Sequence, residues 1–133
     1  QLKIMDITQW LKEVVLPRIK VIRPKNRILL HPTCSCQIMG LTPVLLDIAR
    51  KCAREVILPD NWGCCGASGD RGFIFPELSD SATRDERDEI GHESFDGCYS
   101  LARTCEIAMQ DHIEQPYESI VYLVDETIQD QGT

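Results

Sequence analysis

The chain has 133 residues, which is the length of one domain and enough to bury a hydrophobic core. Its net charge is −7 and its Lys and Arg residues are scattered, so it lacks the clustered positive charge that nucleic-acid binding requires. No apolar run approaches the roughly 18–20 residues that cross a membrane. We therefore expect a soluble single domain with no nucleic-acid partner and no direct membrane span.

Seven cysteines are many for this length, and their number is odd. The chain shows no charged-then-apolar leader with a cleavage site, so the disulfide framework of a small secreted protein is not favoured. Reduced thiols in a cytosolic setting, some of them metal ligands, fit the composition better. The chain begins at Gln1 rather than Met, and we expect it to be a piece of a longer protein.

The secondary-structure signals alternate between helix and strand. Residues 6–15 have the apolar spacing of an amphipathic helix, with Asp6 as its N-cap and Pro17 at its exit. Thr42-Pro43 opens a second helix, and Gly91 follows the end of a third, highly charged one. The expected elements in chain order are helix 6–15, strand 27–31, helix 44–53, strand 55–58, helix 76–90, strand 95–99, helix 106–113 and strand 119–124.

This alternation predicts an α/β fold with right-handed crossovers. We expect three layers, in which helices flank a four-stranded, mostly parallel sheet, together with an additional N-terminal helix. The predicted organisation is an N-terminal helix and connector at 1–26, a cysteine-bearing domain at 27–128 and a frayed tail at 129–133.

Five cysteines follow the first three predicted strands. Cys34 and Cys36 come after the first strand, Cys64 and Cys65 after the second in a glycine-rich loop, and Cys105 after the third. The loops after parallel strands gather at one edge of an open sheet, where ligands bind. Each loop also precedes a helix, whose N-terminus favours negative charge and lowers the pKa of a thiol. The sequence therefore predicts one site lined by thiolates, which soft metals and iron–sulfur clusters require.

The other candidates have plainer interpretations. Cys52 lies on the apolar stripe of a helix and Cys98 lies inside a strand, so both are predicted to be buried structural thiols. His31, at the end of the first strand, is either a ligand, a hydrogen-bond partner of sulfur, or a histidine satisfied locally.

Three segments resemble a known family. They read GCCGASGDRGFIFPELSDSA at 63–82, SLARTCEIAM at 100–109 and PYESIVYLVDE at 116–126. The chain resembles the cysteine-rich CCG domains of heterodisulfide reductase and of the iron–sulfur subunit of glycolate oxidase. Within this group, the sequence of these segments is more similar to the C-terminal domain of FAD-linked oxidoreductases of the D-lactate or D-2-hydroxyglutarate dehydrogenase type. The resemblance covers residues 27–128.

This resemblance implies that Cys34, Cys64, Cys65 and Cys105 are ligands of a cluster or metal. The fuller family motif ends in CxxC, but Ala108 stands at its last position, so a fifth thiolate is missing. Four thiolates suit a [4Fe–4S] cluster or a tetrahedral Zn²⁺ ion, and Cys36 is a candidate substitute ligand.

The implied function is electron transfer. The flavin domain and ferredoxin-like segment of the same parent chain would supply electrons, and a respiratory acceptor would receive them. FAD would bind only in absent parts of the parent protein, so the fragment alone is not expected to be catalytic. The implied location is cytoplasmic, with a peripheral position at the inner membrane left open through the parent protein.

Two other classes of function stay open. The first is a structural or interaction domain whose cysteines bind Zn²⁺ or nothing. The second is thiol–disulfide chemistry by Cys64 and Cys65, or by Cys34 and Cys36, although the chain lacks the CxxC motif at a helix start that favours it.

Overall fold

A computed structural model describes residues 1–128. Its centre is a sheet of four parallel strands in the spatial order β2-β1-β3-β4. The strands are β1 (Lys25–Leu30), β2 (Ala53–Ile57), β3 (Gly97–Ser100) and β4 (Tyr117–Ser119). The predicted four-stranded α/β fold is confirmed, and every pairing in the sheet is parallel.

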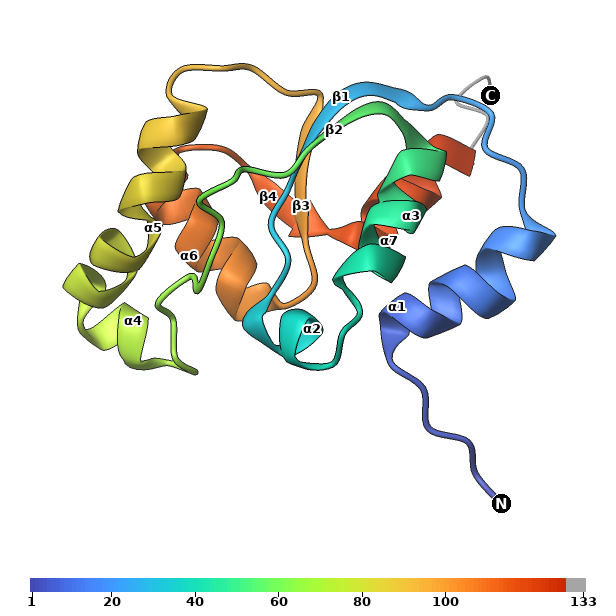
Figure 1. Cartoon of the computed structure of the whole chain (residues 1–133), viewed down its shortest axis with the longest axis horizontal. Coiled ribbons are helices and arrows are strands. Elements are labelled where there is room, and N and C mark those ends of the chain that lie inside the picture. Colours follow the sequence, from blue (N-terminus) through green and yellow to red (C-terminus); the bar gives the residue numbers. More distant parts are fainter. Residues whose placement is uncertain (129–133) are drawn as a thin grey trace.

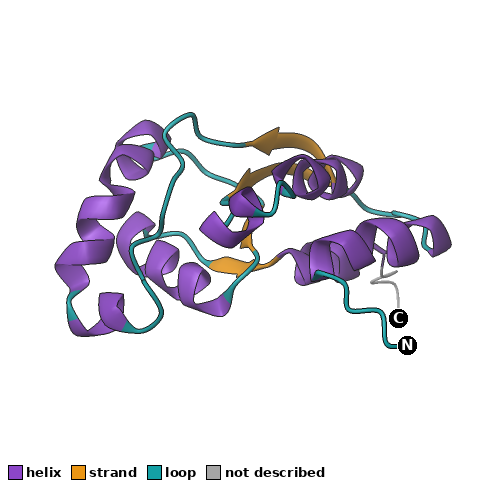
Figure 2. Cartoon of the chain, turned by 60° about the horizontal axis from the view of Figure 1, so that its bottom comes forward, coloured by secondary structure: helices purple, strands orange, loops and turns teal. Residues whose placement is uncertain are grey.

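Helices cover both faces of this sheet, which gives the three layers expected from the sequence (Figures 1 and 2). One layer contains the N-terminal helical segment, α3 and α7, and the other contains α5 and α6. The short helices α2 and α4 lie within connections. The helices are α1 (Ile7–Trp10), η1 (Leu11–Val15), η2 (Leu16–Arg18), α2 (Cys34–Ile38), α3 (Thr42–Cys52), α4 (Arg71–Ile74), α5 (Pro76–Ile90), α6 (Arg103–Ile113) and α7 (Ile120–Ile128).

Strand β1 supplies side chains to both layers because successive residues of a strand point to opposite faces. Ile28 and Leu30 pack with α3 and α7 in the first core, whereas Leu29 packs with α6 in the second. All three side chains are fully buried. Burial on both faces explains why the second half of β1, Ile28 to Leu30, is a continuous apolar run rather than an alternating one.

The predicted strand at 119–124 is wrong. Strand β4 ends at Ser119, and α7 begins at once with Ile120. The side chains of Ile120, Leu123, Val124 and Thr127 are buried, and their spacing is that of one helical face. The β-branched and aromatic residues of this run favour a strand locally, but packing on the first core stabilises a helix instead.

Several predicted boundaries also move. Asp6 caps the first helix, accepting a hydrogen bond from the Thr8 N–H at 2.8 Å, but the helical segment continues to Arg18 instead of ending before Pro17. The predicted helix 106–113 begins at Arg103, and the predicted strand 95–99 lies at 97–100. The helix at 76–90 is confirmed. The frayed tail predicted at 129–133 lies outside the described residues.

The glycine-rich loop before α4 packs against the first turns of α5. Gly66 has φ +74°, and a Cβ atom there would lie 2.6 Å from both the Leu78 carbonyl oxygen and the Ser79 Cα. Gly69 has nearly the same φ, +75°, but open space around it. Only Gly66 therefore combines a left-handed backbone with a close approach to another backbone.

This difference predicts unequal effects of two alanine substitutions. Gly69→Ala should cost about 1–2 kcal/mol of unfolding free energy, because only left-handed strain is added. Gly66→Ala should cost about 3 kcal/mol or more, because steric overlap with α5 adds to that strain. Denaturant unfolding of the two variants measures the difference. Equal losses would show that the loop does not pack on α5 in this way.

Candidate thiolate site

Four cysteines line one hollow at the carboxyl edge of the sheet. They are Cys34, Cys64, Cys65 and Cys105, and the hollow has a volume of about 300 Å³. They come from three segments that are distant in the sequence: α2, the loop after β2 and the first turn of α6. In Figure 1 these segments lie together below the sheet. The structure thus brings together all four residues that the resemblance implies as ligands.

The two cysteines after β1 lie in a short helix, not in the loop expected from the sequence. The Thr33 hydroxyl caps this helix by accepting a hydrogen bond from the Cys36 N–H at 3.2 Å. Cys34 is exposed and lines the hollow, whereas Cys36 is buried in the first core. Burial raises the pKa of the Cys36 thiol. The structure therefore does not bring Cys36, the candidate substitute ligand, to the site.

Cys64 and Cys65, the adjacent cysteines of the glycine-rich loop, differ in their exposure to solvent. Cys64 is exposed, and its sulfur accepts a hydrogen bond from the Gly66 N–H at 3.3 Å. Cys65 is buried in the second core, with its sulfur 3.1 Å from that of Cys105. Cys105 lies in the first turn of α6, although the sequence predicted it to precede the helix. The two adjacent cysteines thus line the same hollow, Cys64 at its exposed side and Cys65 at its buried side.

The close sulfur pair shifts the pKa values of its two members in opposite directions. The pKa of Cys65 is lowered to about 6. The causes are its hydrogen bond to Cys105, a hydrogen bond from the Ala67 N–H and the electrostatic effect of His31, which together outweigh the opposing effect of burial. The pKa of Cys105 is raised by its hydrogen bond to Cys65, by burial, and by the electrostatic effects of Cys65, Cys34 and Cys64. The pair therefore shares a proton near neutral pH, as one thiolate and one thiol.

His31 lies at the end of β1 and is almost fully buried, as is its partner Glu86 on α5. The His31 Nδ1 lies 3.0 Å from one carboxylate oxygen of Glu86 and 3.2 Å from the other. The backbone of His31 extends the sheet, because its N–H donates to the Tyr99 carbonyl at 2.9 Å. The sequence singled out His31, but nothing in it pointed to Glu86.

The remaining cysteines and charged neighbours have structural roles. Cys52 and Cys98 are buried in the two cores, as predicted, and burial raises the pKa of Cys98 to about 12. Arg103 extends into solvent but contacts the buried Glu106 at 3.3 Å. These residues support the sheet and α6 without lining the hollow.

The hollow is lined by four cysteines, whose sulfur atoms are the kind of donor that a soft metal or an iron–sulfur cluster prefers. Among residues 1–128, however, no three Cys, His, Asp or Glu side chains are grouped closely enough to hold a metal ion. The donor set therefore fits such a group in chemistry and location, and binding would require thiol side chains to turn toward it.

Comparisons with family models and with curated proteins add no relative. No family model matches the chain, and no curated protein does. The resemblance to cysteine-rich CCG domains therefore rests on the three sequence segments alone. In the described part of the chain, no helix combines the length and the apolar character needed to cross a membrane.

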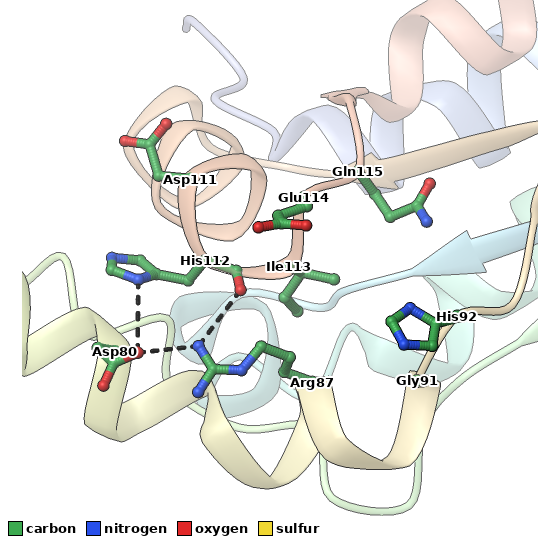
Figure 3. Close-up of a pocket in the computed structure, with 9 residues that line it drawn as sticks. All are labelled: Asp80, Arg87, Gly91, His92, Asp111, His112, Ile113, Glu114 and Gln115. Atoms are coloured by element: carbon green, nitrogen blue, oxygen red, sulfur yellow. Dashed lines mark hydrogen bonds and ion pairs between the residues drawn. The ribbon is translucent and has the colours of Figure 1, made fainter.

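A second hollow, of about 540 Å³, lies between α5 and α6 and was not anticipated from the sequence (Figure 3). Arg87 contacts Asp80 at 2.8 Å and donates to the His112 carbonyl at 3.4 Å, while the His112 ring lies 3.9 Å from Asp80. The Arg87 guanidinium holds the pKa of the exposed Asp80 below its usual value. Because these groups pair with one another, the cluster connects two helices rather than offering free groups to a ligand.

The shared proton of Cys65 and Cys105 predicts a titration in the reduced, metal-free protein. Cys65 should be protonated below pH 6 and anionic above it, so the ultraviolet thiolate absorbance lost in Cys65→Ser should have its midpoint near pH 6. In Cys105→Ala the midpoint should rise toward the ordinary value of about 8.5. Cys98→Ser is the control and should leave the midpoint unchanged. If the Cys65 midpoint were the same in Cys105→Ala as in wild type, the two cysteines would not share a proton.

Proposed function

We propose that this chain is an electron-transfer domain that binds an iron–sulfur cluster, of the [4Fe–4S] type, through Cys34, Cys64, Cys65 and Cys105. The observation that carries the proposal is the convergence of these four thiols, from three separate segments, on one hollow. The motif resemblance supports the same four residues. When bound, such a cluster supplies one-electron chemistry.

The chain's own residues would stabilise the charge of the ligands in different ways. Cys105 lies in the first turn of α6, where unsatisfied backbone N–H groups and the helix dipole favour an anion. The Gly66 N–H already donates to the Cys64 sulfur. Hydrogen bonds to thiolate sulfur tune the reduction potential of a cluster, so the glycine-rich loop would contribute to that potential.

The four cysteines differ in exposure, so the site has a solvent-facing side and a buried side. Cys34 and Cys64 are exposed, whereas Cys65 and Cys105 are buried against the second core. A group held by all four would present one side to solvent. We propose that electrons enter and leave through this side, from the flavin domain and ferredoxin-like segment of a parent chain of the D-2-hydroxy acid dehydrogenase type to a respiratory acceptor.

Anaerobic reconstitution with iron and sulfide tests the proposal. Wild-type protein should bind iron and labile sulfide near cluster stoichiometry and acquire visible absorbance that bleaches on reduction. Zinc as the sole bound metal would favour the structural alternative. A protein that stays colourless and free of metal after reconstitution would contradict cluster binding by this chain.

Serine substitutions identify the ligands. Cys34→Ser, Cys64→Ser, Cys65→Ser and Cys105→Ser should each lower iron content severalfold, because a hydroxyl is a poor substitute for a soft thiolate. Cys98→Ser and Cys52→Ala are the controls, and both should bind as much iron as wild type if they remain folded. Normal iron content in two or more of the four ligand variants would contradict the proposed set.

A second candidate function, thiol–disulfide chemistry, is favoured by the 3.1 Å separation of the Cys65 and Cys105 sulfurs. A disulfide between them would release two protons and two electrons, which a small-molecule disulfide would take up to become two thiols. Incubation of the metal-free protein with oxidised glutathione, followed by non-reducing peptide mapping, tests this. A Cys65–Cys105 link that forms reversibly, in a protein that binds no cluster, would favour the second function.

A further inference from the structure

The buried pair of His31 and Glu86 has no function yet in the proposed site. The exposed fraction of the side chain is 1% for His31 and 2% for Glu86. The His31 Nδ1 contacts Glu86, but the Nε2 of the same ring is buried without a hydrogen-bond partner among the described residues. A buried polar nitrogen without a partner costs free energy, so an unpaired Nε2 indicates a missing contact.

The position of His31 places its ring on the face of the sheet that carries two of the four cysteines of the hollow. His31 is two residues beyond Leu29 on an extended backbone, so the two side chains lie on the same face of the sheet. Leu29 packs in the second core together with Cys65 and Cys105. The electrostatic effect of His31, which is one of the causes that lower the pKa of Cys65, agrees with this placement.

The proton count of the pair decides what Nε2 can do. If Nε2 carries a hydrogen and one further proton is shared between Nδ1 and Glu86, the pair has no net charge. If Nε2 is bare and Nδ1 carries the only ring proton, the carboxylate leaves a net charge of −1 inside the protein. Burying a net charge is costly, and nearby thiolates would repel it further. Of these two protonation states, the neutral pair with a hydrogen on Nε2 is therefore favoured.

We propose that Glu86 orients His31 so that its Nε2–H donates to an anionic sulfur in the hollow, either a cysteine thiolate or the sulfide of a bound cluster. His31 is then a positioning residue that stabilises negative charge on sulfur, and not a metal ligand. The Tyr117 hydroxyl is likewise buried without a hydrogen-bond partner among residues 1–128, and burial, together with the electrostatic effect of Glu86, raises the pKa of Tyr117.

Nitrogen NMR of the metal-free wild-type chain at pH 7 tests the proton count. The protein has three histidines, so the His31 ring signals are those that disappear in His31→Gln. We expect the ¹⁵N shift of a protonated Nε2. A bare Nε2 would overturn the proposal, since the ring could then only accept a hydrogen bond or ligate a metal. This measurement needs no bound cluster.

Redox titration of the reconstituted chain provides the second test, which rests on the proposed function. His31→Asn keeps an amide near the Nδ1 position but loses the Nε2 donor, whereas His31→Gln places an amide near the Nε2 position. His31→Asn should favour the oxidised cluster about tenfold, a shift of about 59 mV to more negative potential for a one-electron couple. His31→Gln should shift less. His112→Asn, which alters an imidazole beside Asp80 away from the hollow, should not shift the potential.

The two measurements separate failure of the inference from failure of the proposed function. If wild type binds no cluster, the proposed function fails, and the NMR result alone decides the role of His31. If wild type and His31→Asn bind clusters of equal potential, the inference fails while the proposed function stands. If His31→Asn does not fold, the potential of His31→Gln and the NMR measurement still decide the outcome. In that case, a His31→Gln potential equal to that of wild type, together with a bare Nε2, overturns the inference.

Discussion

The structure depends on the parallel pairing of its four strands. Parallel strands require a crossover after each one, and every crossover leaves the sheet at the same edge. Three crossovers therefore begin beside one another, and each carries cysteine within its first turns. A reversed strand would have moved its thiol to the opposite edge. The direction of the strands, more than any single contact, is what makes Cys34, Cys65 and Cys105 neighbours.

The sequence was most informative where local preference and tertiary packing agree. The apolar run of β1 and the capped, charged helix α5 were predicted because propensity, capping and burial all favour the same element. Residues 120–124 were mistaken for a strand because β-branched residues fit either a strand or a buried helix. Only the packing of α7 on the first core decides between them, and that packing involves residues distant in the chain.

The same distinction applies to the site. The spacing of cysteines after strands predicted the hollow, but it could not separate Cys34 from Cys36, which face opposite sides of a short helix. Nor could it pair Cys65 with Cys105, because that contact depends on how deep each side chain lies. Glu86 is one of many acidic residues on a helix with a mostly solvated face. Its burial against His31, 55 residues away, arises from the docking of α5 and leaves no local signal.

The contact of the glycine-rich loop with α5 has a consequence for the motion of the site. Gly66 brings the loop backbone so close to the backbone of α5 that no side-chain layer separates the two segments at this point. Cys65 is attached to this loop and Glu86 to this helix, so both are carried by one stiff unit. Ligands and charged neighbours that cannot shift independently keep their geometry when a charge is gained or lost. For the electron transfer that we propose, tight glycine packing would thus lower the reorganisation energy, which is the part of the barrier that comes from nuclear movement.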